Sequence, residues 1–378
     1  MLKLIIPSEK HPNEDRVSIT PDCVASFLKM GISIFVEKDA GLKATFSDEM
    51  YIKSGAKICK TTKELFKGAN IIVKIQRPFN NSKINEFTLI EENSSYLSLI
   101  YQNKFKKEFE SLKKRKTNIF AMELMPRISR AQSMDVLSSQ SNLAGYKAVI
   151  DAASLYNKAF PLMMTSAGTV APAKVLVIGA GVAGLQAIAT AKRLGSVVFC
   201  FDVRAATKEQ VESLGGNFIQ VENKDSGESE SGYAKEMSKD YRKKQAVLLE
   251  ENLSKVDIVI TTALIPGKTA PVLITKKMIK KMKPGSIIMD LASDFGGNCE
   301  LTKHGEIVAF ESKRIIGPIN LSSSVSQDAS RLYSKNILNF FKNSCSDGKF
   351  TDFNWSDELV EGTCILKQKK KIGKLWKQ

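Results

Sequence analysis

The stretch AKVLVIGAGVAGLQAIATAKRLGSVVFCFD, residues 173–202, decides the fold of the chain. It begins with KVLVI, an apolar run typical of a buried strand, and passes through the pattern G-x-G-x-x-G into a helix-like run that ends at Gly195. A second apolar run, SVVFCF, then leads to Asp202. Strand, glycine turn, helix and strand in this order predict a Rossmann-like dinucleotide-binding domain.

The three glycines of this pattern each have a physical role in such a turn. Gly179 permits the tight turn, Gly181 lets the backbone approach a pyrophosphate, and Gly184 allows the helix to pack on the strand. The helix that begins near Val182 offers amide groups and a partial positive charge to the phosphates. A close helix–strand crossing without a ligand is the alternative, which the flanking strands and helix disfavour.

Asp202 and Arg204 bear on the choice of dinucleotide. Asp202 occupies the place where a carboxylate accepts both hydroxyls of the adenosine ribose, and it would repel a 2′-phosphate. This favours NAD(H) over NADP(H), although Arg204 is a counter-signal because arginine can bind that phosphate. Val203 lies between them in the same candidate cofactor-binding segment. An ordinary turn residue at a strand end is the alternative for Asp202.

The first third of the chain alternates apolar runs with amphipathic stretches. Five apolar runs are typical of buried strands: residues 2–7, 32–37, 70–75, 96–101 and 118–123. The stretches between them include two with apolar residues at helical spacing, and this alternation predicts a parallel sheet with helices on both faces. No second G-x-G-x-x-G follows a strand in this region, so we expect one dinucleotide per chain.

Length, charge and cysteine usage limit the function further. At 378 residues the chain is expected to form two domains. The net charge is +16, but Lys and Arg are mixed with Asp and Glu and no nucleic-acid-binding motif accompanies them, so we expect no nucleic-acid partner. The six cysteines are widely separated, and no signal peptide or transmembrane span is recognisable. We expect a cytoplasmic protein with free thiols and no direct membrane insertion.

Groups for acid–base catalysis are scarce. An ordinary dehydrogenase moves a proton with the hydride and most often uses His or Lys for it. The chain has only two histidines: His304 lies in a turn typical of the surface, and His11 lies in the loop after the first strand. Nothing resembles a Ser/His/Asp constellation or a metal cluster. A hydride transfer without a proton partner fits this scarcity, and it occurs when the acceptor is a second nicotinamide.

A second unusual stretch is PRISRAQSMDVLSSQSNLAGYKAVI, residues 126–150. Arg127, Arg130, Gln132 and Asp135 crowd together in it, whereas a solvated loop would usually carry Lys and Glu. Taken alone, Asp135 would be a helix N-cap and Arg127 part of a surface ion pair.

Five segments together resemble the alpha subunit of the proton-translocating NAD(P) transhydrogenases, whose wider family includes alanine dehydrogenase. They are PRISRAQSMDVLSSQSNLAGYKAVI, VIGAGVAGLQAIATAKRLG, TTALIPGKTAPVLIT, MKPGSIIMDLA and GGNCE, and the resemblance extends over essentially the whole chain. It implies an α/β fold of two Rossmann-like domains with parallel sheets. The first domain would be discontinuous, 1–137 plus about 318–378, and the second, 138–317, would bind NAD(H).

The resemblance also implies the partners. NADP(H) would be held by the partner beta subunit, and the membrane helices would belong to separate chains, including the membrane-spanning part of alpha. Hydride would pass directly between the two nicotinamides. The chain would be a homodimer, cytoplasmic and peripheral to the inner membrane through its partner subunits.

Within the stretch 126–150, the resemblance assigns Arg127, Gln132 and Asp135 to hydride transfer and Ser138 to contact with the nicotinamide carboxamide. Asp135 would hold Arg127 by a charge-assisted pair, and Gln132 would reach the ribose of the facing nucleotide. Alignment of the two rings is most of what a direct hydride transfer requires.

Two further segments complete the candidate cofactor-binding residues. The polar, Gly/Ser-rich residues 222–244 resemble a mobile family loop that closes over NAD(H), with Gly232 and Tyr233 at its GYA core. Ala263 and Leu264 lie in the TTALIPGKTAPVLIT motif.

Two other functions stay open on the sequence. Arg16, Lys74 and Asp294 match residues that alanine dehydrogenase uses, but its histidine is missing because the corresponding region is YLSLIYQ. We interpret Arg16 and Lys74 as members of structural ion pairs. An alanine-type NAD-dependent dehydrogenase is therefore the alternative enzyme, and a NAD-sensing binding module is the non-enzymatic alternative.

Overall fold

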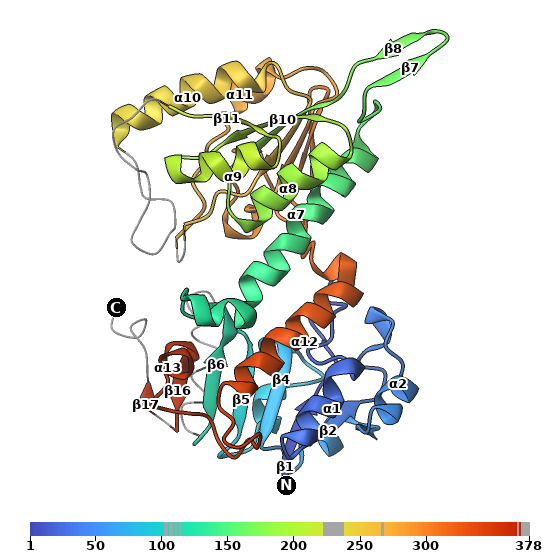
Figure 1. Cartoon of the computed structure of the whole chain (residues 1–378), viewed down its shortest axis with the longest axis vertical. Helices are drawn as coiled ribbons and strands as arrows, with labels where there is room; N and C mark the ends of the chain where they lie inside the picture. Colours follow the sequence, from blue (N-terminus) through green and yellow to red (C-terminus); the bar gives the residue numbers. More distant parts are fainter. Residues whose placement is uncertain are drawn as a thin grey trace. The chain divides into compact units, whose positions relative to one another are not determined.

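The chain folds into two compact units (Figure 1). The computed structural model describes all residues except 102–104, 106–108, 110–111, 113–114, 222–237, 266–267, 369 and 372–378. Unit 1 comprises Met1–Gln140 and Ser323–Gln378, and unit 2 comprises Ser141–Ser322. Of the helices that are described, none is long and apolar enough to cross a membrane.

Unit 1 is built on an 8-stranded sheet in the order β17-β16-β6-β5-β4-β1-β2-β3. The strands are β1 (Leu2–Ile6), β2 (Ile32–Glu37), β3 (Lys57–Cys59), β4 (Ile71–Gln76), β5 (Ser95–Leu99), β6 (Asn118–Ala121), β16 (Cys364–Lys367) and β17 (Lys370–Lys371). Strands β1 to β6 pair in parallel, whereas β16 and β17 are antiparallel additions at one edge. The five strands expected from apolar runs are confirmed, and β16 makes unit 1 discontinuous in sequence.

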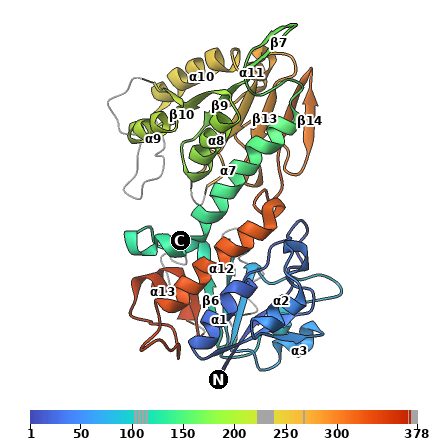
Figure 2. The same cartoon turned by 45° about the vertical axis from the view of Figure 1, so that its right-hand side comes forward.

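Helices cover both faces of this sheet. They are α1 (Pro21–Lys29), η1 (Leu42–Ala44), α2 (Asp48–Lys53), α3 (Thr62–Phe66), α4 (Glu86–Leu89), η2 (Met122–Leu124), η3 (Ser129–Met134), η6 (Ser323–Val325), α12 (Ser326–Lys342) and α13 (Glu358–Thr363). Because side chains alternate along a strand, Leu4 and Ile6 of β1 pack in one apolar cluster and Ile5 packs in another. Helices α1 and α12 lie side by side on the first face (Figures 1 and 2).

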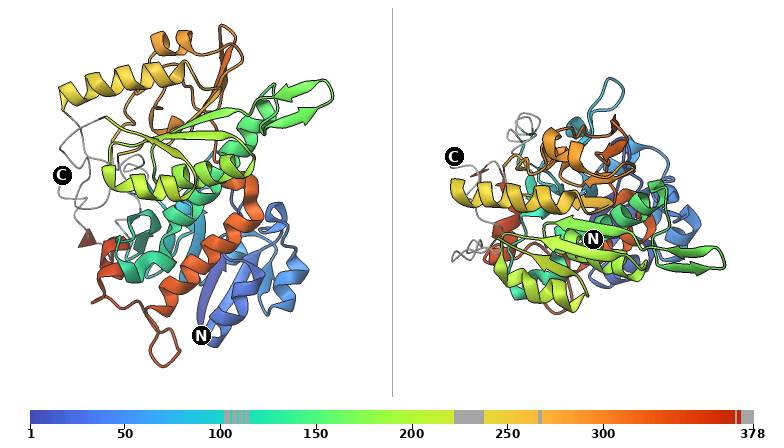
Figure 3. Two further views of the ribbon diagram at one scale, coloured as in Figure 1. Left: turned by 45° about the horizontal axis from the view of Figure 1, so that its top comes forward. Right: turned by 90° about the horizontal axis from the view of Figure 1, so that it is seen from above.

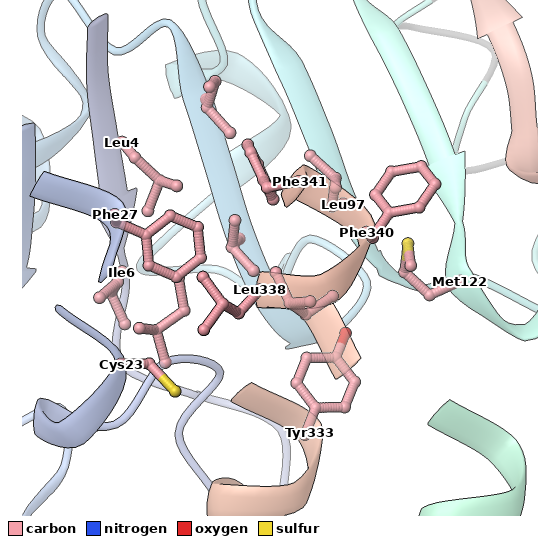
Figure 4. Close-up of a cluster of buried hydrophobic side chains, with 14 of the residues drawn as sticks. Leu4, Ile6, Cys23, Phe27, Leu97, Met122, Tyr333, Leu338, Phe340 and Phe341 are labelled. Atoms are coloured by element: carbon pink, nitrogen blue, oxygen red, sulfur yellow. The ribbon is translucent and has the colours of Figure 1, made fainter. Parts of the chain in front are cut away.

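The helix α12 supplies much of the core of unit 1 (Figure 4). Its Tyr333, Phe340 and Phe341 are buried in one apolar cluster, in which Phe341 packs against Phe27 of α1. The phenol of Tyr333 donates a hydrogen bond to Lys74 O at 2.8 Å. Full burial of one large apolar side chain is worth roughly 1.5–3 kcal/mol. The C-terminal segment is therefore part of the structural core of unit 1.

Unit 2 is built on a 7-stranded sheet in the order β11-β10-β9-β12-β13-β15-β14. The strands are β9 (Lys174–Ile178), β10 (Val197–Phe201), β11 (Asn217–Ile219), β12 (Ile258–Thr261), β13 (Ile287–Asp290), β14 (Ile307–Phe310) and β15 (Lys313–Ile316). All neighbours are parallel except the edge strand β14. From β11 to β15 this is the strand order of a Rossmann fold, with its reversal between β9 and β12.

The helices of unit 2 also cover both faces of its sheet. They are α7 (Val136–Leu155, which begins in unit 1), α8 (Val182–Arg193), η4 (Ala205–Thr207), α9 (Lys208–Ser213), α10 (Lys239–Leu253), α11 (Lys276–Lys281) and η5 (Ser293–Phe295). Val175 and Val177 of β9 pack with α7, α8 and α9, whereas Leu176 and Ile178 pack with α10 and α11. The expected α/β fold with helices on both faces of two parallel-dominated sheets is confirmed.

A small hairpin projects from unit 2 (Figures 1 and 3). It consists of β7 (Met163–Thr165) and β8 (Gly168–Val170), which form a separate antiparallel pair. All residues of both strands are exposed.

Candidate functional site

The glycine turn of unit 2 joins β9 to α8 where the strand order of the sheet reverses. Gly179 has φ +103°, which residues with a side chain rarely adopt, and a Cβ there would lie 2.6 Å from Thr262 Oγ1. A Cβ on Gly184 would overlap the carbonyl oxygen of Gly179. A Cβ on Gly181, in contrast, would meet nothing within 4 Å. Packing requires the first and third glycines, whereas Gly181 leaves open space beside the turn.

The start of α8 is suited to an anion. Gly181 is the N-cap of this 12-residue helix, and no side chain caps it. The amides of a first helical turn have no partner within the helix and carry partial positive charge. With the open space at Gly181, the turn fits the pyrophosphate of a dinucleotide.

Asp202 braces the glycine turn from the end of β10. Its Oδ2 accepts from Ala180 N at 2.6 Å and its Oδ1 accepts from Arg204 N at 2.8 Å. The guanidinium of Arg204 donates to the same carboxylate, through Nε to Oδ1 at 3.0 Å and Nη2 to Oδ2 at 2.8 Å. A ribose at Asp202 would therefore have to replace contacts with Arg204. Val203 between them is half-buried.

Ala263 and Leu264 follow Thr262, the first residue after β12, and Ala263 lies beside the glycine turn. The preceding Thr262 donates its hydroxyl to Gly179 O at 2.9 Å, and a Cβ on Gly179 would lie 3.3 Å from Ala263 N. The structure thus brings together the glycine turn, Asp202 and the residues after β12 at one edge of the sheet.

The loop before α7, in unit 1, is anchored by its buried and charged residues. Ala131 and Met134 are buried in the core. Arg130 donates Nη1 to Asp357 Oδ2 at 2.9 Å and Nη2 to Asp357 Oδ1 at 2.8 Å, and it also pairs with Glu358. The pKa of Asp357 is lowered to about 2 by the hydrogen bond from Arg130.

The same loop is also held through its backbone. Ser133 O accepts from Asn336 Nδ2 at 2.8 Å and from Asn339 Nδ2 at 3.2 Å, both on α12. Arg127 and Gln132 remain exposed. The loop therefore presents an arginine and a glutamine on an anchored backbone.

Asp135 is held by hydrogen bonds at the start of α7. Its Oδ1 accepts from Ser138 N at 2.9 Å and its Oδ2 from Ser138 Oγ at 2.6 Å, which is the geometry of an N-cap on α7. The expected ion pair between Asp135 and Arg127 stays a prediction. The carboxylate is used to start the helix, as the alternative interpretation had it.

Gly232 and Tyr233, the expected core of the closing loop, lie outside the described residues.

Arg16 and Lys74 lie in a buried network of charges in unit 1. Arg16 donates Nε to Glu14 Oε1 at 2.7 Å and Nη2 to Glu14 Oε2 at 2.6 Å. Lys74 donates Nζ to Glu86 Oε2 at 2.7 Å and lies 3.7 Å from Glu9 Oε2. Their interpretation as structural ion pairs is confirmed.

Neither histidine lies in the glycine turn or in the loop before α7. His11 Nε2 lies 3.0 Å from Arg77 O, and burial lowers its pKa. His304 is exposed, with Nδ1 3.1 Å from Ser293 Oγ and Nε2 3.9 Å from Asp294 Oδ1. In the part of the chain that is described, no three His, Cys, Asp or Glu residues are grouped to hold a metal ion.

The residues that anchor the loop were missed by sequence reasoning. Asp357 could have been recognised as a helix N-cap, because Leu359 N donates to its Oδ1 at 2.8 Å. Its pairing with Arg130, like the contacts of Asn336 and Asn339, joins distant parts of the sequence and leaves no local pattern.

Fold and site together define a class: a two-unit α/β protein in which unit 2 has the strand order and glycine turn of a dinucleotide-binding Rossmann fold. Two family models match the chain, "Alanine dehydrogenase/PNT, N-terminal domain" over residues 5–144 and "Alanine dehydrogenase/PNT, C-terminal domain" over residues 148–374. The chain belongs to the alanine dehydrogenase/PNT family.

Within this family, the chain is similar in sequence to transhydrogenase alpha subunits. It is 51% identical over 370 residues to the first portion of the NAD(P) transhydrogenase alpha subunit of Rhodospirillum rubrum, covering 97% of this chain and 96% of the relative. It is 47% identical over 369 residues to the corresponding protein of the same name from Rickettsia prowazekii, covering 98% and 96%. The expected resemblance to transhydrogenase alpha subunits is confirmed.

Solved structures agree. The transhydrogenase structure from Sinorhizobium meliloti superimposes with a TM-score of 0.86 at 42% identity, covering 98% of this chain and 100% of that chain. An L-alanine dehydrogenase superimposes with a TM-score of 0.81 at 20% identity, covering 99% and 98%, and shares the fold.

Proposed function

We propose that this chain is the NAD(H)-binding subunit of a proton-pumping NAD(P) transhydrogenase and that it passes hydride directly to NADP+ held on a partner subunit. The observation that carries the proposal is the anchored loop before α7. Arg130 and Ser133 fix its backbone, whereas Arg127 and Gln132 stay exposed. Such groups orient a nucleotide and need not exchange a proton with it.

In this proposal NAD(H) binds at the glycine turn of unit 2. The amides at the start of α8 bind the pyrophosphate, and Asp202 binds the adenosine ribose in exchange for contacts with Arg204. Bound NADH supplies the hydride, and the transfer requires no protein acid or base. The residues Val182, Val203, Ala263 and Leu264 line the same edge of the sheet.

The loop of unit 1 aligns the reacting nucleotides. Arg127 and Gln132 contact them, and Gln132 reaches the ribose of the nucleotide on the partner. Ser138 contacts the carboxamide, and Asp135 fixes Ser138 through two hydrogen bonds. Positioning of this kind lowers the barrier of a direct transfer.

We further propose that NADP(H) is bound by the beta subunit and that membrane-spanning subunits move the protons. The chain is then cytoplasmic and peripheral to the inner membrane through these partners. The relatives are named as alpha subunits or as portions of one, which supports a complex of several subunits. A homodimer is supported by the β7–β8 hairpin, where Met164 is 83% exposed and Leu162, the residue before β7, is 57% exposed.

A reconstitution experiment tests the proposal. The purified chain is mixed with the NADP(H)-binding domain of a transhydrogenase beta subunit, and transfer from NADH to an NADP+ analogue is followed. We expect transfer only when both proteins are present. Alanine-dependent reduction of NAD+ by the chain alone would overturn the proposal in favour of an amino-acid dehydrogenase. Tight NADH binding with neither activity would favour a NAD-sensing module.

A further inference from the structure

The segment GGNCE, residues 296–300, has no role in the proposed function although it is one of the motifs of the family resemblance. It follows β13 and η5 in unit 2. Gly296 and Gly297 have φ +102° and +87°, conformations that favour glycine, and a Cβ on Gly297 would lie 2.8 Å from Asp290 Oδ2. The two glycines therefore let the backbone turn closely around the carboxylate of Asp290.

Asp290, the last residue of β13, is a fully buried carboxylate whose hydrogen bonds all come from neutral groups. The donors are Thr261 Oγ1 at 2.8 Å, Ala292 N at 3.1 Å, Asn298 N at 2.8 Å, Cys299 N at 3.1 Å and Thr302 Oγ1 at 2.7 Å. Several donors can compensate for burying a carboxylate. Asp290 thus joins the end of β12 to the GGNCE turn and orients Asn298.

Asn298 is fully buried and holds two separate points of the segment after β12. Ala263 N donates to Asn298 Oδ1 at 3.0 Å, and Asn298 Nδ2 donates to Ala263 O at 2.8 Å and to Pro271 O at 2.9 Å. Its backbone oxygen also accepts from Leu273 N at 2.8 Å and Ile274 N at 3.0 Å. The side-chain amide of Asn298 thus bonds both the N–H and the carbonyl of Ala263, as the backbone of a neighbouring strand would do.

The position of Ala263 matters for the glycine turn. Thr262, one residue earlier, donates its hydroxyl to Gly179 O at 2.9 Å. A Cβ on Gly179 would lie 3.3 Å from Ala263 N and 3.3 Å from the carbonyl carbon of Thr262, so the two backbones are in close contact. A shift of Ala263 would therefore be transmitted to the turn that is suited to the pyrophosphate.

We infer that Asn298, oriented by Asp290, is a positioning residue for the dinucleotide: it fixes the backbone of Ala263 and Leu264 against the glycine turn before the ligand binds. The inference rests on the proposed function only in taking NADH as the ligand of unit 2. A site that is formed in advance binds its ligand without the entropy cost of ordering the segment.

The test uses Asn298→Asp in the full chain, with NADH as the probe. The variant keeps the acceptor for Ala263 N but replaces two N–H donors by an oxygen that faces the carbonyls of Ala263 and Pro271. We expect the Kd for NADH to rise about tenfold or more. In the reconstituted transfer reaction, the KM for NADH should rise while kcat at saturating NADH changes less.

Asp257→Asn is the matched control. Asp257 is also buried and also receives a backbone bond, from Lys174 N at 2.8 Å, but it lies at the amino end of β12, the opposite edge of the sheet. The substitution Asp257→Asn should lower the unfolding temperature and leave the Kd for NADH within about twofold of the wild-type value. If Asn298→Asp does not fold, Asn298→Ala, which introduces no buried charge, decides the question.

Two outcomes would overturn the inference: a folded Asn298 variant that binds NADH as the wild type does, or equal losses of affinity in the Asn298 and Asp257 variants. Failure of the wild-type chain to bind NADH would instead contradict the proposed function.

Discussion

Arg130 and Asp357 are 227 residues apart in the sequence and form a bidentate ion pair, with N–O distances of 2.9 and 2.8 Å. The pair joins the loop before α7 to the N-cap of α13. Because Arg130 lowers the pKa of Asp357 from 3.8 to about 2, the folded state favours the ionised carboxyl. The stabilisation is present above the unfolded pKa and is lost as the pH falls through about 2. At neutral pH the anchor is therefore fully formed.

Removal of the ion pair between Arg130 and Asp357 should slow hydride transfer more than it weakens NADH binding. We expect Arg130→Met to slow hydride transfer about tenfold, because the loop that carries Arg127 and Gln132 becomes less well positioned. The Kd for NADH should change much less than the rate, since the groups proposed to bind its pyrophosphate and adenosine ribose lie in unit 2. Lys255→Met, which removes an exposed ion pair with Glu251, is the control. An unchanged rate for Arg130→Met would show that the contacts of Ser133 alone suffice.

Gln132→Asn shortens the exposed side chain by one methylene and keeps its amide. If Gln132 reaches the ribose of the partner's nucleotide, the rate of hydride transfer should fall at least tenfold, and the Kd for NADH should stay unchanged. A tenfold loss of rate corresponds to an activation free energy that is higher by about 1.4 kcal/mol. Stopped-flow transfer and NADH titration measure the two quantities. Ser133→Ala tests the neighbouring exposed position, where only the backbone oxygen is engaged. Loss of NADH affinity in Gln132→Asn would mean that this residue serves the other nucleotide.

The strands and the glycine turn could be predicted because their signals are local. An apolar run such as KVLVI is buried on both faces of a parallel sheet, and the glycine spacing is set by one turn. The edge strands β3 and β14 were not predicted. β3 has only three residues, and β14 has alternating half-buried and exposed positions, so neither is a continuous buried run.

The arrangement of the candidate site was less predictable. The pairing of Arg130 with Asp357, and that of Asn298 with Ala263, depend on how distant segments pack. Asp135 is the opposite case, because its spacing from Ser138 is the local pattern of an N-cap. Ser138 N and Oγ both donate to the carboxylate of Asp135, at 2.9 and 2.6 Å.

The exposed hairpin predicts how the chain associates. A two-stranded hairpin is marginal alone in water, and Met164 exposes 83% of its surface. We expect the wild type to sediment as a dimer and Met164→Glu to weaken the dimer about tenfold or more. Val247→Glu, at a 67% exposed position of α10, is the control and should stay dimeric. A monomeric wild type, or an unaffected Met164→Glu, would exclude the hairpin as the interface.

The buried carboxyl of Glu9 should make the stability of the folded chain depend on pH. Burial raises its pKa from 4.5 to about 7, against the attraction of Lys74 and with added repulsion from Glu14 and Glu86. Glu9 therefore contributes stability that is present below the unfolded pKa and is lost as the pH rises through about 7. Denaturant midpoints between about pH 5 and pH 8 should fall in the wild type and fall less in Glu9→Gln. Glu251→Gln, at an exposed carboxylate, should keep the wild-type slope, and an equal slope in Glu9→Gln would contradict the assignment.

Substitutions of Gly181 and Gly184 should have different effects, the first on NADH binding and the second on the stability of the fold. A Cβ on Gly181 meets nothing within 4 Å and the residue has φ −78°, so Gly181→Ala should leave the unfolding temperature unchanged or slightly raised. It should nevertheless weaken NADH binding about tenfold or more, because the methyl group would occupy the space through which the pyrophosphate approaches the backbone. Gly184→Ala should destabilise the folded chain by about 1–3 kcal/mol, because its Cβ would overlap Gly179 O. If Gly181→Ala binds NADH normally, the open space beside the turn is not where the dinucleotide lies.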